Sequence, residues 1–213
     1  MTGHEILVLA GTNGAGKSSV AGAALRQAGG EYFNPDEATT RYAKLTPHGD
    51  LAEANSLAWH EGRRRLEQAI AERRSFRFET TLGGRTITEL LIKASNVGLP
   101  VRMLYVGLES PELHQKRVAS RVLAGGHAIP KEKVIQRFED SRANLIRLLP
   151  HLAELKVFDN SAEADPKAGL CPSLRLLLHV RQGSVRFLAD LSGVPDWSKP
   201  IVLQALKLFR PAP

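Results

Sequence analysis

EILVLAGTNGAGKS, residues 5–18, is the stretch of sequence that decides the fold. Its first part, Ile6–Ala10, is an apolar run that stops at Gly11, which is the pattern of a short buried strand. Residues 11–18 match G-x-x-x-x-G-K-[ST] at every fixed position, and an alanine-rich helical pattern follows over residues 18–27. A strand, a glycine-rich turn and a helix in this order predict a loop whose backbone N–H groups bind phosphate.

Each fixed position of this loop has a chemical reason. Glycine lets the backbone turn tightly and approach phosphate oxygens. Lys17 supplies a cation for the outer phosphates, and the Ser18 hydroxyl suits Mg²⁺, so ATP and Mg²⁺ are the expected cofactors. The alternative interpretation is a plain glycine-rich turn between a strand and a helix. The residues expected to bind the nucleotide are Gly11, Asn13, Gly14, Ala15, Gly16, Lys17, Ser18 and Ser19.

Strand and helix patterns alternate along the chain as far as residue 158. Strands are expected at residues 5–10, 31–33, 76–78, 101–106 and 155–158. Helices are expected at residues 18–27, 35–44, 51–74, 86–94, 111–123 and 131–149. This alternation predicts an α/β fold of the P-loop NTPase and kinase type, with a parallel sheet covered by helices on both faces.

Beyond residue 166 the pattern changes. Residues 173–180 and 184–188 predict a hairpin around Gln182-Gly183, and a helix is expected near residues 201–208. We therefore expect a P-loop domain over residues 1–166, with a helical lid at about 110–149, and a small basic C-terminal extension over residues 167–213.

Composition and charge exclude several classes of protein. Of the 213 residues, 43% are hydrophobic and 24% charged, which excludes a disordered chain, a collagen and a coiled coil. The apolar runs are too short to span a membrane, and the first residues show no secretory signal, so we expect a cytoplasmic protein. The single cysteine, Cys171, excludes an internal disulfide and a cysteine-clustered metal site. The net charge is +7, and residues 167–213 hold seven basic and two acidic groups, which suit either a polyanion or a solvated surface.

Three acidic residues follow predicted strands, at the sheet edge where the phosphate loop also lies. Asp36 is placed to take a proton from an acceptor hydroxyl, but the sequence Asn34-Pro35-Asp36 also suits an ordinary helix start. Glu79 suits a ligand of a magnesium-bound water or of a substrate, with Thr80 beside it; the alternative is an ion pair with a nearby arginine. Asp159 competes with Glu79 for the metal-water role, and its alternative role is in a turn.

Arg117 and Arg121 are four residues apart, so they share one face of a predicted helix. The segment GGHAIP, residues 125–130, breaks that helix before the next one starts near Lys131. Two helices with arginines and a glycine pair between them predict a lid that closes over the phosphates and neutralises the charge on the transferring group. The alternative is a plain helical hairpin with solvated arginines.

The ordered set of motifs resembles the zeta-toxin-like P-loop kinases, and the resemblance covers residues 6–161. The motifs are GTNGAGKS at 11–18, FNPDE at 33–37, FETTL at 78–82, RVASRVLAGGHAIP at 117–130 and RFEDSRANL at 137–145. The resemblance implies that ATP and Mg²⁺ are used to phosphorylate a sugar hydroxyl of UDP-N-acetylglucosamine. It does not identify an antitoxin partner, although it allows one.

The same resemblance gives roles to individual residues. Lys17 and Ser18 would hold phosphate and metal, Asp36 would be the catalytic base, and Glu79 would lie near the sugar nucleotide. Arg117 and Arg121 fall where a charge-neutralising lid arginine is expected. This sequence departs from the toxins at residues 125–127, because the toxins have a longer segment with a second arginine there.

Two hypotheses follow from the sequence. The first is a kinase that transfers the γ-phosphoryl group of ATP to a hydroxyl of a small molecule, with no membrane and no nucleic acid involved. The second is a P-loop ATPase switch that binds a protein or nucleic-acid partner through its basic C-terminal region.

Overall fold

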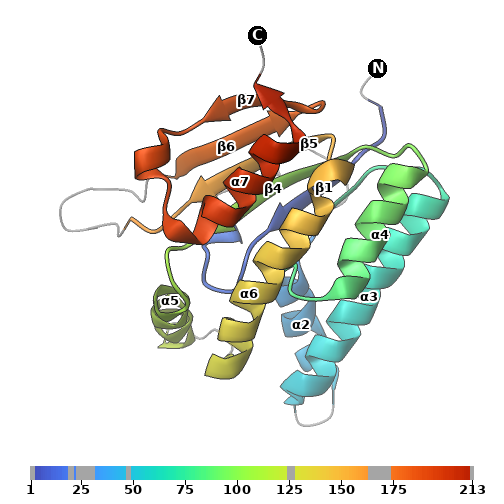
Figure 1. Ribbon diagram of the computed structural model, residues 1–213. Coiled ribbons are helices and arrows are strands. Elements are labelled where there is room, and N and C mark those ends of the chain that lie inside the picture. Colours follow the sequence, from blue (N-terminus) through green and yellow to red (C-terminus); the bar gives the residue numbers. More distant parts are fainter. Residues whose placement is uncertain are drawn as a thin grey trace.

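The computed structural model describes residues 3–18, 22, 32–46, 49–123, 128–162 and 174–211. Eight strands form one sheet in the order β2-β3-β1-β4-β5-β6-β7-β8 (Figure 1). The strands are β1 (Ile6–Ala10), β2 (Tyr32–Phe33), β3 (Phe76–Thr80), β4 (Val101–Gly107), β5 (Glu154–Asp159), β6 (Arg175–Arg181), β7 (Ser184–Leu188) and β8 (Arg210–Pro211). The first five strands are parallel to one another, whereas β6 and β7 add antiparallel to the edge at β5. The predicted α/β class with a mostly parallel sheet is confirmed.

Six α-helices complete the described fold. They are α2 (Pro35–Ala43), α3 (Leu51–Ala71), α4 (Arg85–Asn96), α5 (Pro111–Leu123), α6 (Lys131–Leu148) and α7 (Lys199–Leu208). Each lies where the sequence pattern predicts a helix. The predicted helix over residues 18–27 falls largely outside the described residues, as do Ser19 and the Gly125-Gly126-His127 segment.

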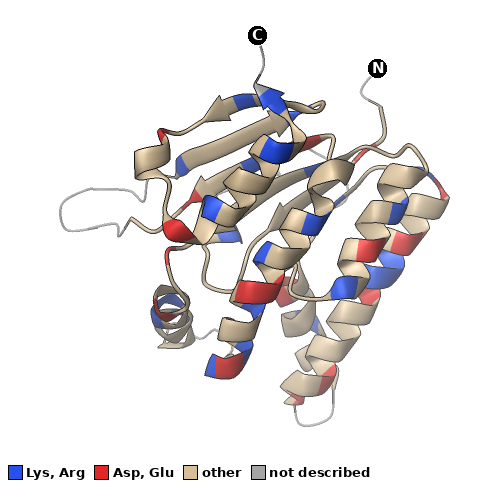
Figure 2. Ribbon diagram, in the orientation of Figure 1, with Lys and Arg blue, Asp and Glu red and all other residues tan. Residues whose placement is uncertain are grey.

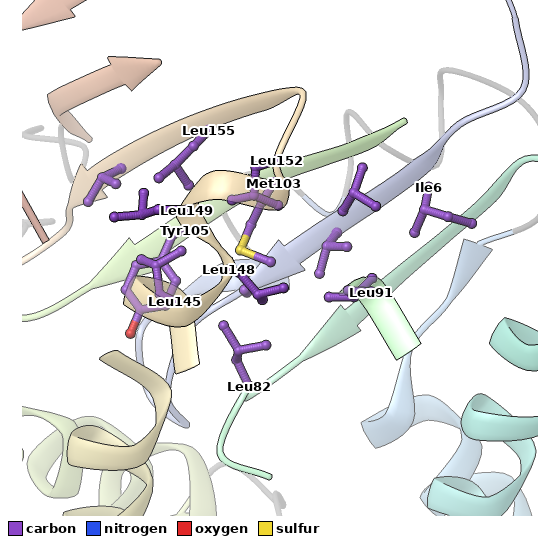
Figure 3. Close-up of a cluster of buried hydrophobic side chains, with 14 of the residues drawn as sticks. Ile6, Leu82, Leu91, Met103, Tyr105, Leu145, Leu148, Leu149, Leu152 and Leu155 are labelled. Carbon is purple, nitrogen blue, oxygen red and sulfur yellow. The ribbon is translucent and has the colours of Figure 1, made fainter. Parts of the chain in front are cut away.

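Helices α3, α4, α6 and α7 lie over the same face of the sheet and build the main core with it (Figure 1). Alternate residues of a strand point to opposite faces, so Ile6 and Val8 of β1 face this core, while Leu9 belongs to a small cluster with Ala15 and Val106. Figure 3 shows side chains from β4, α4, α6 and the loop after β3 meeting in the core, among them Met103, Leu91, Leu145 and Leu82. Burying each leucine stabilises the fold by about 2 kcal/mol.

The region after residue 166 continues the sheet and the core. Gln182 and Gly183 both have positive φ angles, as the two-residue turn of a tight hairpin requires, and this turn joins β6 to β7. Ile201, Val202 and Ala205 of α7 are buried in the core that the parallel strands share. The predicted hairpin and helix are therefore confirmed. The elements on the two sides of residue 166 form one sheet, and the division of the chain into two parts there stays a prediction.

Trp197 ties this region to the parallel strands. Its ring covers Gly107 at the end of β4 so closely that an added Cβ atom there would lie 2.4 Å from a ring carbon. Its indole Nε1–H donates to the Asp159 carboxylate at 3.1 Å. Within the part of the chain that the structure describes, no helix has the length and hydropathy needed to cross a membrane.

Candidate active site

The phosphate loop leaves the carboxyl end of β1 between its two neighbours, β3 and β4. The Gly11 N–H donates to the Thr80 carbonyl of β3 at 3.2 Å. Gly11 has a φ of +142°, and an added Cβ atom would lie 2.1 Å from the Val106 carbonyl oxygen of β4. Glycine at this position is therefore required by backbone conformation and by the close approach of β4.

Helix α5 packs directly on the loop. Gly14 has a φ of +82°, and an added Cβ atom would lie 2.6 Å from the His114 carbonyl oxygen. The buried imidazole of His114 donates from Nδ1 to the Asn13 carbonyl at 2.7 Å. Burial lowers the pKa of His114 to about 4, aided by the positive charges of Lys17 and Arg117, although the Asn13 contact opposes the shift. The neutral ring therefore supports the loop as a hydrogen-bond donor.

Asn160, which follows β5, supports the loop from another side. Its Nδ2 donates to the Ala15 carbonyl at 2.9 Å. Its Oδ1 is buried and has no hydrogen-bond partner among the described residues. The neighbouring Asp159 accepts from Ser161 Oγ at 2.5 Å and from Trp197, and it is not among the residues that line the cavities described below.

Glu79, at the end of β3, is the buried carboxylate beside the loop. Its Oε2 accepts from Ser18 Oγ at 2.9 Å, and its Oε1 accepts from the Tyr32 hydroxyl and from Asn34 Nδ2. Among the described residues its partners are thus hydroxyls and an amide, not the nearby arginines. Lys17 donates from Nζ to the Gly11 carbonyl at 2.7 Å. Burial lowers the pKa of Lys17, while the negative charges of Glu79 and Asp36 oppose that shift.

Because Asn34 caps helix α2, Asp36 can lie in the first turn of this helix and still face the phosphate loop. Asn34 Oδ1 accepts the Asp36 N–H at 2.8 Å and the Glu37 N–H at 3.4 Å, so it is the N-cap of α2 with Pro35 in the first turn. The Asp36 carboxylate is half exposed, and its Oδ2 accepts from Arg121 Nη1 of α5 at 3.0 Å. The sequence of an ordinary helix start therefore also carries a carboxylate into the cavity.

A cavity of about 400 Å³ lies over the loop and brings together most of the predicted site residues. Arg117 and Arg121 both line it, as their shared helix face predicts, and Arg117 also donates to the Ala162 carbonyl at 3.3 Å. The other lining residues are Asn13, Gly14, Gly16, Lys17, Ser18, Asn34, Pro35, Asp36, Glu79, Thr80, Thr81 and Asn160.

A second cavity of about 530 Å³ adjoins the first. The two share seven residues, namely Asn13, Pro35, Asp36, Glu79, Thr80, Thr81 and Arg121. Helices α2, α3 and α6 supply most of the remaining wall, which includes Phe33, Thr39, Leu51, Asn55, Trp59, Arg63, Lys133 and Arg137. Sequence reasoning had no signal for the α3 residues, since they belong to an ordinary amphipathic pattern.

Helix α6 is anchored to the sheet through its polar side. Ser141 Oγ is 2.9 Å from the Tyr105 hydroxyl, and Asn144 Nδ2 donates to the Leu82 carbonyl at 2.9 Å. Val134, Phe138 and Leu145 are buried on the same helix. The lid at about residues 110–149 stays a prediction, and these contacts oppose any closure that moves α6.

Comparison with solved structures shows what the fold resembles. The AvrRxo1-ORF1:AvrRxo1-ORF2 structure with ATP is 17% identical, with a TM-score of 0.62, over 95% of this chain and 64% of that chain. A structure of the PezAT toxin–antitoxin system of Streptococcus pneumoniae has a TM-score of 0.50 at 17% identity, over 80% and 75% of the two chains. A putative kinase from Chloroflexus aurantiacus has a TM-score of 0.50 at 13% identity, over 66% and 80%. At these identities the likeness concerns the fold, which is that of P-loop kinases.

Sequence comparison finds one protein that is similar over a shorter stretch, and one family whose model matches the chain. An uncharacterized protein of Haemophilus influenzae is 33% identical over 70 residues, which are 33% of this chain and half of that protein's length. The model of a family described as AAA domain matches residues 6–145, from β1 into α6. The chain therefore belongs to this AAA domain family, with a P-loop kinase-like fold.

Proposed function

We propose that this protein is an ATP- and Mg²⁺-dependent kinase of the zeta-toxin-like class that phosphorylates a hydroxyl of a small molecule. The observation that carries the proposal is the position of Asp36, which lines both cavities. One cavity is built on the phosphate loop and suits ATP. The other adjoins it at Asp36 and offers room for an acceptor of metabolite size.

The residues then have distinct tasks. Lys17 and the loop N–H groups bind the phosphates, and Asp36 takes the proton as the acceptor oxygen bonds to the γ-phosphorus and the bond to ADP breaks. Arg117 and Arg121 stabilise the charge on the transferring group. Catalysis of this kind depends on positioning and electrostatics, with no covalent intermediate on the protein.

The oxygen donors beside the loop fit Mg²⁺. The Ser18 hydroxyl would be a direct ligand of Mg²⁺. The buried Glu79 carboxylate, whose Oε2 is 2.9 Å from Ser18 Oγ, would hold a water molecule bound to the ion. Among the described residues, no group of three or more His, Cys, Asp or Glu is arranged around a metal. Mg²⁺ usually keeps several waters and takes phosphate oxygens as ligands. A bound Mg²⁺ supplies charge neutralisation at the β- and γ-phosphates.

The wall of the second cavity suggests the chemistry of the acceptor. Trp59 lines this cavity and is 42% exposed, and Arg63 and Lys133 add positive charge. An aromatic surface beside cations suits an acceptor that carries both a ring and anionic groups. UDP-N-acetylglucosamine is such a molecule and is the first acceptor to test. The toxin–antitoxin system among the similar folds also makes an antitoxin-like partner part of this proposal.

The test is transfer of label from γ-labelled ATP, with Mg²⁺, to UDP-N-acetylglucosamine and to a panel of other hydroxyl metabolites. The Asp36→Asn variant should lose transfer by about 10²- to 10⁴-fold, because the base is gone, while its ATP affinity changes by less than about twofold. Glu37→Gln is the matched control, since this neighbouring carboxylate lines neither cavity. Full transfer by Asp36→Asn would refute the role of Asp36.

Free phosphate released at a rate that no acceptor changes would instead support the ATPase switch. One structural fact weighs against its basic-tail form. Lys and Arg residues after residue 174 are spread over β6, β7, α7 and β8 rather than gathered on one element (Figure 2). Removing this region would also take away strands and core residues of the shared sheet, so point variants are the appropriate tool.

A further inference from the structure

Arg137 of α6 lies where the phosphate loop meets the second cavity. Its Nη1 donates to Asn13 Oδ1 at 2.7 Å, and its carbonyl oxygen accepts from Thr12 Oγ1 at 3.3 Å. The side chain lines the second cavity, and Asn13 lines both. Arg137 therefore bonds to the phosphate loop through both its backbone carbonyl and its guanidinium, from the side of the second cavity.

The guanidinium has no anionic partner within ion-pair distance in the part of the chain that the structure describes. Its hydrogen-bond acceptor, Asn13, is a neutral amide. The Asp36 carboxylate, which lines the same cavity, already pairs with Arg121. Burial lowers the pKa of Arg137, with Asp36 opposing the shift, and the positive charges of Arg137 and Lys17 act on each other.

A partly buried cation without an anion costs free energy, because lost hydration is not replaced. An arginine keeps its charge in proteins, so it cannot relieve this cost by losing a proton. The arrangement is stabilised when an anionic ligand binds. The ligand must lie at the junction of the two cavities, where Asn13, Asp36 and Arg137 come together.

We propose that Arg137 is a catalytic residue that binds the γ-phosphoryl group during transfer. The inference rests on the proposed function, because that function places the γ-phosphoryl group at this junction. As the acceptor oxygen bonds to phosphorus and the bond to ADP breaks, charge spreads over the three outer oxygens. A guanidinium held beside them stabilises that charge, and its planar fork suits two of the oxygens at once.

The surroundings hold Arg137 in place before any ligand binds. Gly83, in the loop after β3, leaves room for the side chain, since an added Cβ atom there would lie 2.9 Å from Arg137 Cγ. One and two turns further along α6, Ser141 and Asn144 bond to the sheet and to the loop after β3. Such fixed charges need little reorganisation as charge develops in the transition state.

Nucleotide binding tests the proposal without knowledge of the acceptor. The full chain is titrated calorimetrically with ADP and with AMP-PNP, both with Mg²⁺, because only AMP-PNP has a γ-phosphoryl group. Arg137→Gln should weaken AMP-PNP binding about tenfold and leave ADP binding within about twofold. Arg137→Lys keeps the charge but loses the planar fork, so it should recover part of the loss. Arg147→Gln is the control, since this exposed arginine lies on the same helix, away from both cavities.

A second variant leaves the guanidinium in place and moves it. Gly83→Ala should displace the Arg137 side chain and reduce the preference for AMP-PNP in the same direction. Gly84→Ala is its control, because an added Cβ atom at Gly84 meets nothing within 4 Å.

Equal losses for both nucleotides, or no loss for either, in a folded Arg137→Gln would overturn the assignment and leave the proposed function standing. If that variant does not fold by circular dichroism, Arg137→Lys and Gly83→Ala decide in the same way. Wild-type protein that binds neither nucleotide would overturn the proposed function together with this inference.

Discussion

Protonation of His114 should destabilise this protein at mildly acidic pH. In the unfolded chain the imidazole takes a proton below its usual pKa of 6.5, whereas in the folded protein burial lowers that pKa to about 4. Between these two values the unfolded state binds more protons, so the free energy of unfolding falls as the pH falls. The two pKa values correspond to a loss of about 2 kcal/mol at pH 5 and about 3 kcal/mol at pH 4.

The assay is urea unfolding of the wild type and of His114→Asn at pH 7 and at pH 5. Asparagine does not titrate, and its amide keeps a donor near the position of Nδ1. The variant should be less stable at pH 7, because it loses the ring contact with Phe138. Its further loss between pH 7 and pH 5 should be about 2 kcal/mol smaller than that of the wild type.

His60→Asn is the matched control, since His60 is exposed on α3 and its ring lies against the exposed Trp59. It should show the same pH dependence as the wild type. An equal loss on acidification in the wild type and in His114→Asn would refute the reasoning. It would mean that the buried imidazole is not what resists protonation in the folded protein.

Two further predictions concern glycines at close approaches. Gly11→Ala should destabilise the protein by about 3 kcal/mol or more in urea unfolding, because its Cβ atom would lie 2.1 Å from a β4 carbonyl oxygen. The same variant should lose calorimetric binding of ATP. Gly84→Ala, with open space around the new atom, should change neither the stability nor ATP binding. Gly107→Ala should cost about 1–3 kcal/mol in urea unfolding, because the new atom would push the Trp197 ring away from Asp159. Wild-type stability in Gly107→Ala would show that this ring can move freely.

The α/β class, the phosphate loop and nearly all helices were predictable from local sequence. The G-x-x-x-x-G-K-S pattern depends on neighbours within eight residues, and the positive φ of Gly11 belongs to the same turn. The capping sequence Asn34-Pro35-Asp36 also predicts the start of its helix from neighbouring residues alone. These features depend on short-range conformational preference, which a single sequence displays directly.

Which acidic residue faces the loop was not predictable. Glu79 and Asp159 both follow parallel strands, so pattern and spacing treat them alike. In the structure Glu79 accepts a hydrogen bond from Ser18, whereas Asp159 accepts one from Trp197, a residue from the region beyond the parallel strands. That outcome depends on the antiparallel addition of β6 and β7 to the sheet edge, which no local pattern specifies.

The sequence by itself determined a buried strand followed by a glycine-rich loop, a pattern that predicts phosphate binding. Only the tertiary structure decided what completes the site. Arg137 and Asn13 are 124 residues apart in the chain, and their contact exists because α6 packs its polar side against the sheet. Local motifs are encoded in short-range backbone preferences, whereas the charge balance of a cavity is set by which distant helices the core brings together.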